Sequence, residues 1–181
     1  MKIDRDDFDT AGDAAPRPHA NTYWLLPGRV LAGEHPDNGD KATLMRRLEG
    51  LRAAGVTCCI DLTGTDAPHG YRPLPVADRP ARREPHGIVD FGVPSVAGMR
   101  RVLDAIAAAL AADEMVYLHC RAGIGRTGTV AGCLLVEAGF TPDAALALLQ
   151  RKWRAMAKSA MVPQTPETDA QRAFIAAWVR R

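Results

Sequence analysis

The hydrophobic pattern of the first third of the chain predicts strands and one helix. Two short strands are expected at 23–26 and 29–32, because Pro27-Gly28 between them is a turn signal. Residues 41–54 repeat leucine at helical spacing and precede a glycine, which predicts a helix. The apolar, β-branched run 56–62 that follows is typical of a buried strand.

The rest of the chain carries four helical patterns, one more strand and one long loop. Residues 63–87 hold five prolines and predict a surface loop with one short strand near its end. A helix capped by Ser95 follows, and then a buried strand at 115–118. Residues 127–138 are apolar nearly all round, which predicts a central helix. Two later helices are expected to begin at Thr141-Pro142-Asp143 and Thr165-Pro166-Glu167, each a hydroxyl cap, a proline and an acid.

This order of elements predicts an α/β fold with a small, mostly parallel central sheet of about four to five strands and helices on both faces. We expect one domain over residues 21–181, because the chain shows no internal repeat and its length suits a single core. Residues 1–20 are polar and proline-containing, and are expected to form a loose tail.

Composition narrows the function classes. A net charge of +2 is too small to indicate a nucleic acid or an anionic membrane as partner. The acidic start lacks an apolar run, and no apolar stretch reaches transmembrane length. The four cysteines form no CxxC pair and no Cys/His cluster, so neither a metal site nor a disulfide framework is favoured. We expect a cytoplasmic monomer without a cofactor.

The chemistry is concentrated in residues 115–128, MVYLHCRAGIGRTG. A buried strand runs into a loop with three glycines and then into a buried helix, so loop amides and the helix start can face one anion. Arg126 adds a planar fork that suits two phosphate oxygens. The expected substrate-binding residues are Arg121, Ala122, Gly123, Ile124, Gly125 and Arg126.

Cys120 stands at the mouth of this phosphate cradle. The groups that attract a phosphate dianion also favour a thiolate, which is placed for in-line attack on phosphorus. Arg126 and the loop amides are expected to stabilise the transition state, and Thr127 to donate a hydrogen bond to the sulfur. A structural cysteine and a surface arginine are the alternative, which would require this whole pattern to arise by accident.

Two other phosphate-binding motifs fit less well. Gly123, Gly125 and Gly128 satisfy GxGxxG, the dinucleotide fingerprint. That fold requires a further parallel strand ending in an acid about 20 residues later, whereas helices are expected after residue 140. A Walker A loop is not matched either.

A leaving alkoxide or phenoxide needs a proton, and Asp90 is the candidate acid. It lies in Ile88-Val89-Asp90-Phe91-Gly92-Val93-Pro94, a glycine- and proline-bearing loop before a helix, which can act as a mobile flap. Taken alone, an Asp before Pro and Ser is more often a turn or cap residue.

HCRAGIGRTG resembles the Cys-x5-Arg signature of the protein tyrosine phosphatase superfamily, and DFGVP at 90–94 resembles its acid loop. The segment 23–34 is similar to the start of compact, dual-specificity-type bacterial members. The resemblance implies a dual-specificity phosphatase-like fold, no metal, Cys120 as nucleophile and Arg126 as phosphate ligand. It further implies that Asp90 is general acid and then base, that Thr127 assists the thiolate, and that His119 orients the loop.

The resemblance implies hydrolysis of phosphate monoesters through a phosphocysteine, on phosphotyrosine and phosphoserine or phosphothreonine of proteins. A phosphoinositide or other small-molecule phosphatase remains an alternative. Phosphoinositide phosphatases of the superfamily often carry lysines inside the loop, whereas this loop has the cationic Arg121 but the uncharged Ile124, which makes a highly phosphorylated inositol less favoured. A non-catalytic phosphate-recognition module, and a thiol redox enzyme that uses Cys133 as resolving thiol, are further alternatives.

Several residues have weaker claims on function. The arginines of the long loop can form a basic rim or stay solvated, and Tyr71 can stack on a phosphotyrosine ring. Gln171 is expected on a helix surface, although it can also position a water. Asp61 is expected to be a structural hydrogen-bonding partner. The arginines are Arg72, Arg79, Arg82 and Arg83, and the cysteines expected in the core are Cys58, Cys59 and Cys133.

Overall fold

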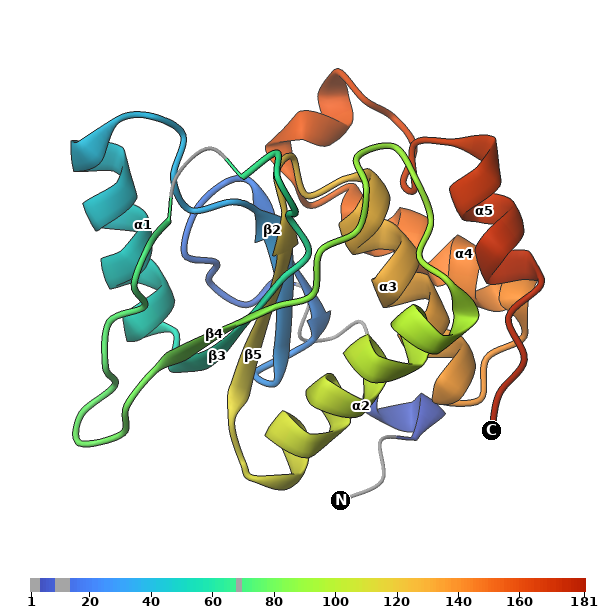
Figure 1. Ribbon diagram of the computed structural model, residues 1–181, viewed down its shortest axis with the longest axis horizontal. Coiled ribbons are helices and arrows are strands. Elements are labelled where there is room, and N and C mark those ends of the chain that lie inside the picture. Colours follow the sequence, from blue (N-terminus) through green and yellow to red (C-terminus); the bar gives the residue numbers. More distant parts are fainter. Residues whose placement is uncertain (1–3, 9–13, 68–69) are drawn as a thin grey trace.

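A five-stranded sheet runs through the middle of the protein in the computed structural model, which describes residues 4–8, 14–67 and 70–181 (Figure 1). The strand order is β1-β2-β5-β3-β4, and only β1 is antiparallel to its neighbour. The predicted α/β class with a mostly parallel sheet is therefore confirmed. The strands are β1 (Thr22–Leu26), β2 (Val30–Glu34), β3 (Val56–Asp61), β4 (Arg82–Pro85) and β5 (Met115–Cys120).

Helices cover both faces of the sheet, so β1, β2, β3 and β5 are buried along their whole length (Figure 1). One helix, α1, packs on one face over a small core, and the other four cover the opposite face over a larger core. The helices are α1 (Lys41–Ala53), α2 (Val96–Ala111), α3 (Gly125–Glu137), α4 (Pro142–Trp153) and α5 (Asp169–Ala176), with 3-10 turns η1 (Arg5–Phe8) and η3 (Ala157–Ala160).

The helix starts at Ser95 and Thr141 are confirmed. The Ser95 hydroxyl accepts a hydrogen bond from the Gly98 amide at 3.0 Å, and the Thr141 hydroxyl accepts one from Ala144 at 3.3 Å. Helix α3 is central, as predicted, and twelve of its thirteen residues are buried.

The predicted start of the last helix is wrong. Helix α5 begins at Asp169, and Thr168 and Gln171 form a capping box at its start. Thr165 instead donates its hydroxyl hydrogen to the carbonyl of Ile124, at 2.9 Å, and precedes a cis peptide bond. Its side chain is thus used to hold the segment before α5 against the start of α3.

The segment expected to be a loose tail lies partly outside the described residues. Its described part contacts the domain: Phe8 is buried, and its ring meets Phe140 edge-on with centroids 6.0 Å apart. The Trp24 indole donates a hydrogen bond to the carbonyl of Pro16 at 3.3 Å. Among the described residues, none of the helices has the length and apolar character needed to cross a membrane.

Three neighbouring parallel strands end at the same edge of the sheet. Glu34 of β2 lies opposite Cys120 of β5, and Asp61 of β3 lies opposite His119. Because ligand sites in such sheets form beyond the carboxyl ends of the strands, this edge is where the sequence-predicted residues converge.

Candidate active site

The loop of residues 120–126 joins β5 to α3 and packs directly on β2. Gly123 has a φ of +76°, and a Cβ there would lie 2.5 Å from the carbonyl carbon of Gly33. Only glycine meets both constraints. Ile124, at the N-cap of α3, offers no side-chain acceptor, so this residue does not occupy the first amides of the helix.

Cys120 ends β5 beneath this loop, with 2% of its surface exposed. The Gly123 amide donates a hydrogen bond to its sulfur, with N and Sγ 3.3 Å apart. The other three cysteines, Cys58, Cys59 and Cys133, are likewise buried in the core, as predicted. Burial raises the pKa of Cys58 and of Cys59 to about 12, so both remain protonated thiols.

Arg126 lies at the start of α3 and is almost fully buried. Asp66 holds it end-on, with Oδ1 2.8 Å from Nη1 and Oδ2 2.7 Å from Nη2. Burial is the largest single influence on the pKa of Arg126 and lowers it. The hydrogen bonds with Asp66, together with negative charge on Cys120, Asp66 and Asp90, outweigh burial and raise the pKa above the usual value. The same bonds lower the pKa of Asp66 to about 2. Sequence reasoning missed Asp66, because a single acid in a proline-rich loop carries no motif.

The loop of residues 88–94 lies over Arg126 and brings Asp90 to it. Oδ1 of Asp90 is 2.7 Å from Nη2 of Arg126, and the Ile88 carbonyl accepts a hydrogen bond from Nη1 at 3.1 Å. Phe91, which follows Asp90, has a φ of +57°, an uncommon backbone conformation for an aromatic residue. The structure thus brings together Cys120 and Arg126, predicted from one motif, and Asp90, predicted from a second motif 30 residues earlier in the chain.

Two residues near the start of α5 complete this wall of the site. Gln171 is fully buried, and its Nε2 donates a hydrogen bond to the carbonyl of Gly92 at 3.1 Å. The prediction of a helix-surface glutamine is therefore wrong. Glu167 packs beside it against Gly125, where an added Cβ would lie 2.5 Å from Oε1 of Glu167. Burial, and then the charge of Asp90, raise the pKa of Glu167.

Thr127 and His119 flank Cys120 in sequence. The Thr127 hydroxyl is buried and makes no hydrogen bond with any described residue, so its predicted bond to the sulfur is not formed here. His119 is fully buried, with Nε2 2.6 Å from the Tyr71 hydroxyl. Burial lowers the pKa of His119 to about 3, against the opposing charge of Asp61, so the ring is neutral.

The long loop after β3 does not line the site as a basic rim. Arg79 donates to the Asp113 carbonyl at 2.9 Å, Arg82 pairs with Glu84 and Glu114, and Arg83 donates to Asp61 at 2.6 Å. These three arginines therefore bind carbonyl or carboxylate partners within the protein. Tyr71 is buried on His119, so it is not available to stack on a substrate ring.

One group of described residues has the donor types of a metal site. Ligand atoms of His35, Asp61 and His119 lie within 4.8 Å of one another, all in buried side chains. Asp61, however, already accepts hydrogen bonds from Thr63 and Arg83. We therefore assign this group to a buried polar network in which Asp61 binds Thr63 and Arg83. This assignment agrees with the structural role expected for Asp61.

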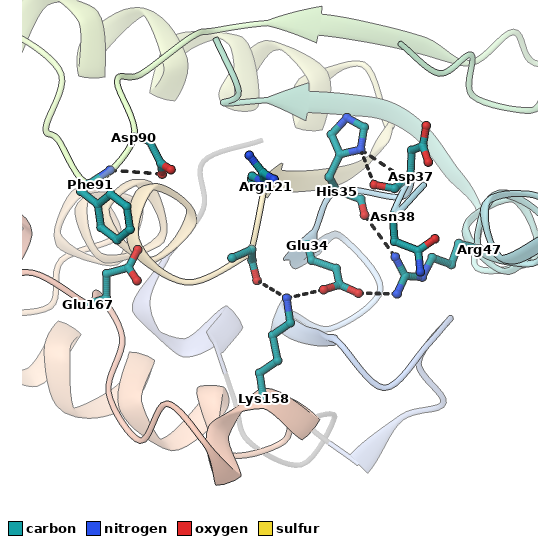
Figure 2. Close-up of a pocket in the computed structure, with 11 residues that line it drawn as sticks. Glu34, His35, Asp37, Asn38, Arg47, Asp90, Phe91, Arg121, Lys158 and Glu167 are labelled. Atoms are coloured by element: carbon teal, nitrogen blue, oxygen red, sulfur yellow. Dashed lines mark hydrogen bonds and ion pairs between the residues drawn. The ribbon is translucent and has the colours of Figure 1, made fainter. Parts of the chain in front are cut away.

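A pocket of about 430 Å³ opens beside the 120–126 loop (Figure 2). Asp90, Phe91 and Glu167 form one wall, and residues after β2 form the other, with Arg121 between them. Arg121 is exposed, and its backbone carbonyl accepts a hydrogen bond from the His35 amide at 3.1 Å. The lining residues are Glu34, His35, Asp37, Asn38, Arg47, Asp90, Phe91, Arg121, Ala122, Lys158 and Glu167.

Three solved structures with the same fold each share less than 25% sequence identity with this chain. The active form of Tk-PTP shares 23% identity over 86% of this chain and 93% of its own, with a TM-score of 0.67. PTPMT1, solved in complex with PI(5)P, shares 16% identity over 90% and 92%, with a TM-score of 0.61. A variant of TpbA from P. aeruginosa, solved in complex with pTyr, shares 19% identity over 93% and 98%, with a TM-score of 0.60.

The family itself is shown by a sequence profile that spans most of the chain. The profile is described as the Swiss Army Knife protein, DSP-PTPase phosphatase domain (PTP-SAK), and it matches residues 19–175. This range covers every strand of the sheet and every residue of the site described above. The chain therefore belongs to the PTP-SAK family of dual-specificity-type phosphatase domains.

Proposed function

We propose that this phosphatase domain hydrolyses phosphate monoesters through a covalent phosphocysteine on Cys120. The observation that carries the proposal is the meeting of three groups at one loop. Cys120 accepts an amide hydrogen bond inside the 120–126 loop, Arg126 closes that loop, and Asp90 stands 2.7 Å from the guanidinium. A nucleophile, an anion ligand and a proton donor are thereby within reach of one phosphate group.

In the first step, the phosphate of the substrate enters the 120–126 loop, binds Nη2 of Arg126 and displaces Asp90 from that atom. The Cys120 thiolate attacks phosphorus from the side opposite the leaving oxygen, and the S–P bond forms as the P–O bond breaks. Asp90, displaced from the guanidinium toward the leaving oxygen, takes up a proton from solvent and gives it to that oxygen. Arg126 and the inward amides stabilise charge on the equatorial oxygens.

In the second step, water attacks the phosphocysteine. Asp90 now accepts a proton from this water, the P–O bond forms, and the S–P bond breaks to return the thiolate. Gln171 lies beside Gly125 on the same side of the loop and can help to place the water. Thr127 is a source of a hydrogen bond to the departing sulfur, since its buried hydroxyl has no other partner among the described residues.

For the substrate class, we propose phosphotyrosine and phosphoserine or phosphothreonine of proteins. Both acidic and basic side chains line the pocket, so it lacks the concentrated positive charge that a multiply phosphorylated inositol requires. The relatives solved with pTyr and with PI(5)P make both substrate classes worth testing. The one exposed cation between the two walls, Arg121, is the feature that favours a lipid headgroup.

The test is turnover by the purified protein of a small aryl phosphate, phosphopeptides and phosphoinositides, with a chelator present. We expect hydrolysis of the aryl phosphate, inhibition by vanadate, and a higher kcat/KM for phosphopeptides than for phosphoinositides. A higher kcat/KM for the lipids would overturn the substrate class. Phosphopeptide binding without turnover, or thiol-dependent arsenate reduction in its place, would overturn the reaction itself.

A further inference from the structure

Lys158, on the turn η3 far from the predicted motifs, contacts the 120–126 loop. Its Nζ donates a hydrogen bond to the carbonyl of Ala122 at 3.1 Å and forms an ion pair with Glu34. Glu34 ends β2, directly opposite Cys120 in the sheet register. Figure 2 shows Lys158 and Arg47 meeting Glu34 from different sides of the pocket.

The contact with Ala122 bears on the sulfur because of peptide geometry. In a planar trans peptide, the carbonyl and the following N–H point in opposite directions. The carbonyl of Ala122 points to Lys158, and the N–H of the same peptide unit, that of Gly123, points to Sγ of Cys120 at 3.3 Å. A cation on the carbonyl also polarises the peptide, which strengthens the hydrogen bond at its other end.

The preceding peptide is held in the same sense. The Arg121 carbonyl accepts a hydrogen bond from the His35 amide at 3.1 Å, so the Ala122 N–H of that peptide unit is directed away from β2. Two successive carbonyls of the loop are thus held by hydrogen bonds, that of Arg121 by the amide of His35, directly after β2, and that of Ala122 by Lys158. This leaves the two amides that follow them turned toward the anion site.

Glu34 keeps the Lys158 ammonium in place. Burial raises the pKa of Glu34. Hydrogen bonds from Lys158 and Asn21, together with the positive charges of Lys158 and Arg47, outweigh burial, so the pKa falls below its usual value and the carboxylate is charged. The side chain of Lys158 is 24% exposed and its partner only 9%, so the ion pair is well shielded from water.

We propose that Lys158 is a positioning residue that stabilises the Cys120 thiolate through the Ala122–Gly123 peptide. The proposal rests on the proposed function of Cys120 as nucleophile. It assigns to η3 a part in catalysis without contact with the substrate. Arg47 offers a matched control, because it binds the same Glu34 carboxylate. Its other hydrogen bonds with described residues go to the carbonyls of His35 and Pro36, outside the loop.

The experiment compares Lys158→Met, Lys158→Arg and Arg47→Met with the wild type by the pH dependence of Cys120 alkylation by iodoacetamide, without substrate. The core cysteines do not compete, because burial keeps them as thiols. For Lys158→Met we expect a profile displaced to higher pH, with alkylation about three- to tenfold slower near pH 6. A similar fall in kcat/KM, mainly in kcat, should accompany it. Lys158→Arg should restore most of the alkylation rate, and Arg47→Met should keep the wild-type pH profile of alkylation.

A wild-type alkylation profile in Lys158→Met would overturn the proposal. An equal displacement in Arg47→Met would do so too, because the effect would then belong to the Glu34 ion pairs as a whole. A rise in KM alone would indicate that Lys158 contacts the substrate instead. Since alkylation needs no turnover, the test stands even if the wild type hydrolyses no phosphate ester, a result that would overturn only the proposed function.

Discussion

Asp66 binds Arg126 end-on through both Nη atoms, at 2.8 and 2.7 Å, in a pairing that does not use Nε. This bidentate pair fixes the plane of the arginine at the start of α3. Asp90 shares the Nη2 atom. We therefore expect an incoming phosphate to displace Asp90 while Asp66 stays bound to Arg126.

Replacing Asp66 with Ala should therefore impair phosphate binding although Arg126 is intact. We expect kcat/KM for an aryl phosphate to fall about 10- to 100-fold, because a misplaced ligand costs that much in oriented catalysis. Inhibition by vanadate should weaken in parallel. Asp78→Ala, an exposed acid of the same loop, serves as control and should behave as wild type. Wild-type kinetics in Asp66→Ala would show that Arg126 needs no such support.

Asp90→Asn tests the proton donor. Without a proton to give, the variant should lose about 100-fold or more in kcat with alkyl-like leaving groups. The loss should be much smaller with a leaving group that departs as a stable anion. The measurement is kcat across a series of phosphate esters of graded leaving-group acidity. An equal loss across the series would assign Asp90 to binding rather than to proton transfer.

Gly123→Ala tests the contact between the 120–126 loop and β2. The added Cβ would meet backbone atoms of Gly33 and Glu34, which no side-chain rotation relieves, and the φ of +76° adds strain. We expect a destabilisation of about 1–3 kcal/mol by urea denaturation, with loss of vanadate inhibition. Gly28→Ala separates the two causes, because Gly28 has a φ of +69° with no atom near the added Cβ. It should destabilise less and keep full activity.

The buried histidines predict how stability depends on pH. Burial lowers the pKa of His119 to about 3 and also lowers that of His35, whereas both histidines titrate near 6.5 in the unfolded chain. Below that pH the unfolded state binds more protons than the folded state, so stability should fall as pH drops from about 6.5 toward 5. Urea midpoints across this range should show the decline, with a shallower slope in His119→Gln. Equal slopes would mean that His119 does not contribute.

The sequence carried enough information for the class of fold and for the three central residues, because these depend on local patterns. Buried apolar runs marked the strands, and the Cys120–Arg126 spacing marked a strand, loop and helix. The sequence could not point to Asp66 or Lys158, because each contacts the 120–126 loop from a segment distant in sequence. Tyr71 was placed on the surface because its loop is rich in proline, and only the tertiary contact with His119 explains its burial.

The last helix shows where a local rule competes with another. Thr165-Pro166-Glu167 satisfied the pattern of a helix start, but so did Thr168 with Gln171 as a capping box. Contact of Thr165 with the Ile124 carbonyl decided between them. Because the helix begins at Asp169, Gln171 lies in its first turn and is buried. The sequence-based prediction placed the helix start too early and therefore placed Gln171 on the surface.

The claim that Cys120 is the nucleophile is tested most directly by trapping its phosphoryl intermediate. A brief reaction of the wild type with an aryl phosphate, quenched in acid and digested, should yield one phosphorylated peptide, the one that contains Cys120, by mass spectrometry. The Cys120→Ser variant should yield no such peptide and no turnover, while it still binds phosphate. Turnover by Cys120→Ser, or by the wild type without any phosphorylated Cys120, would contradict the account.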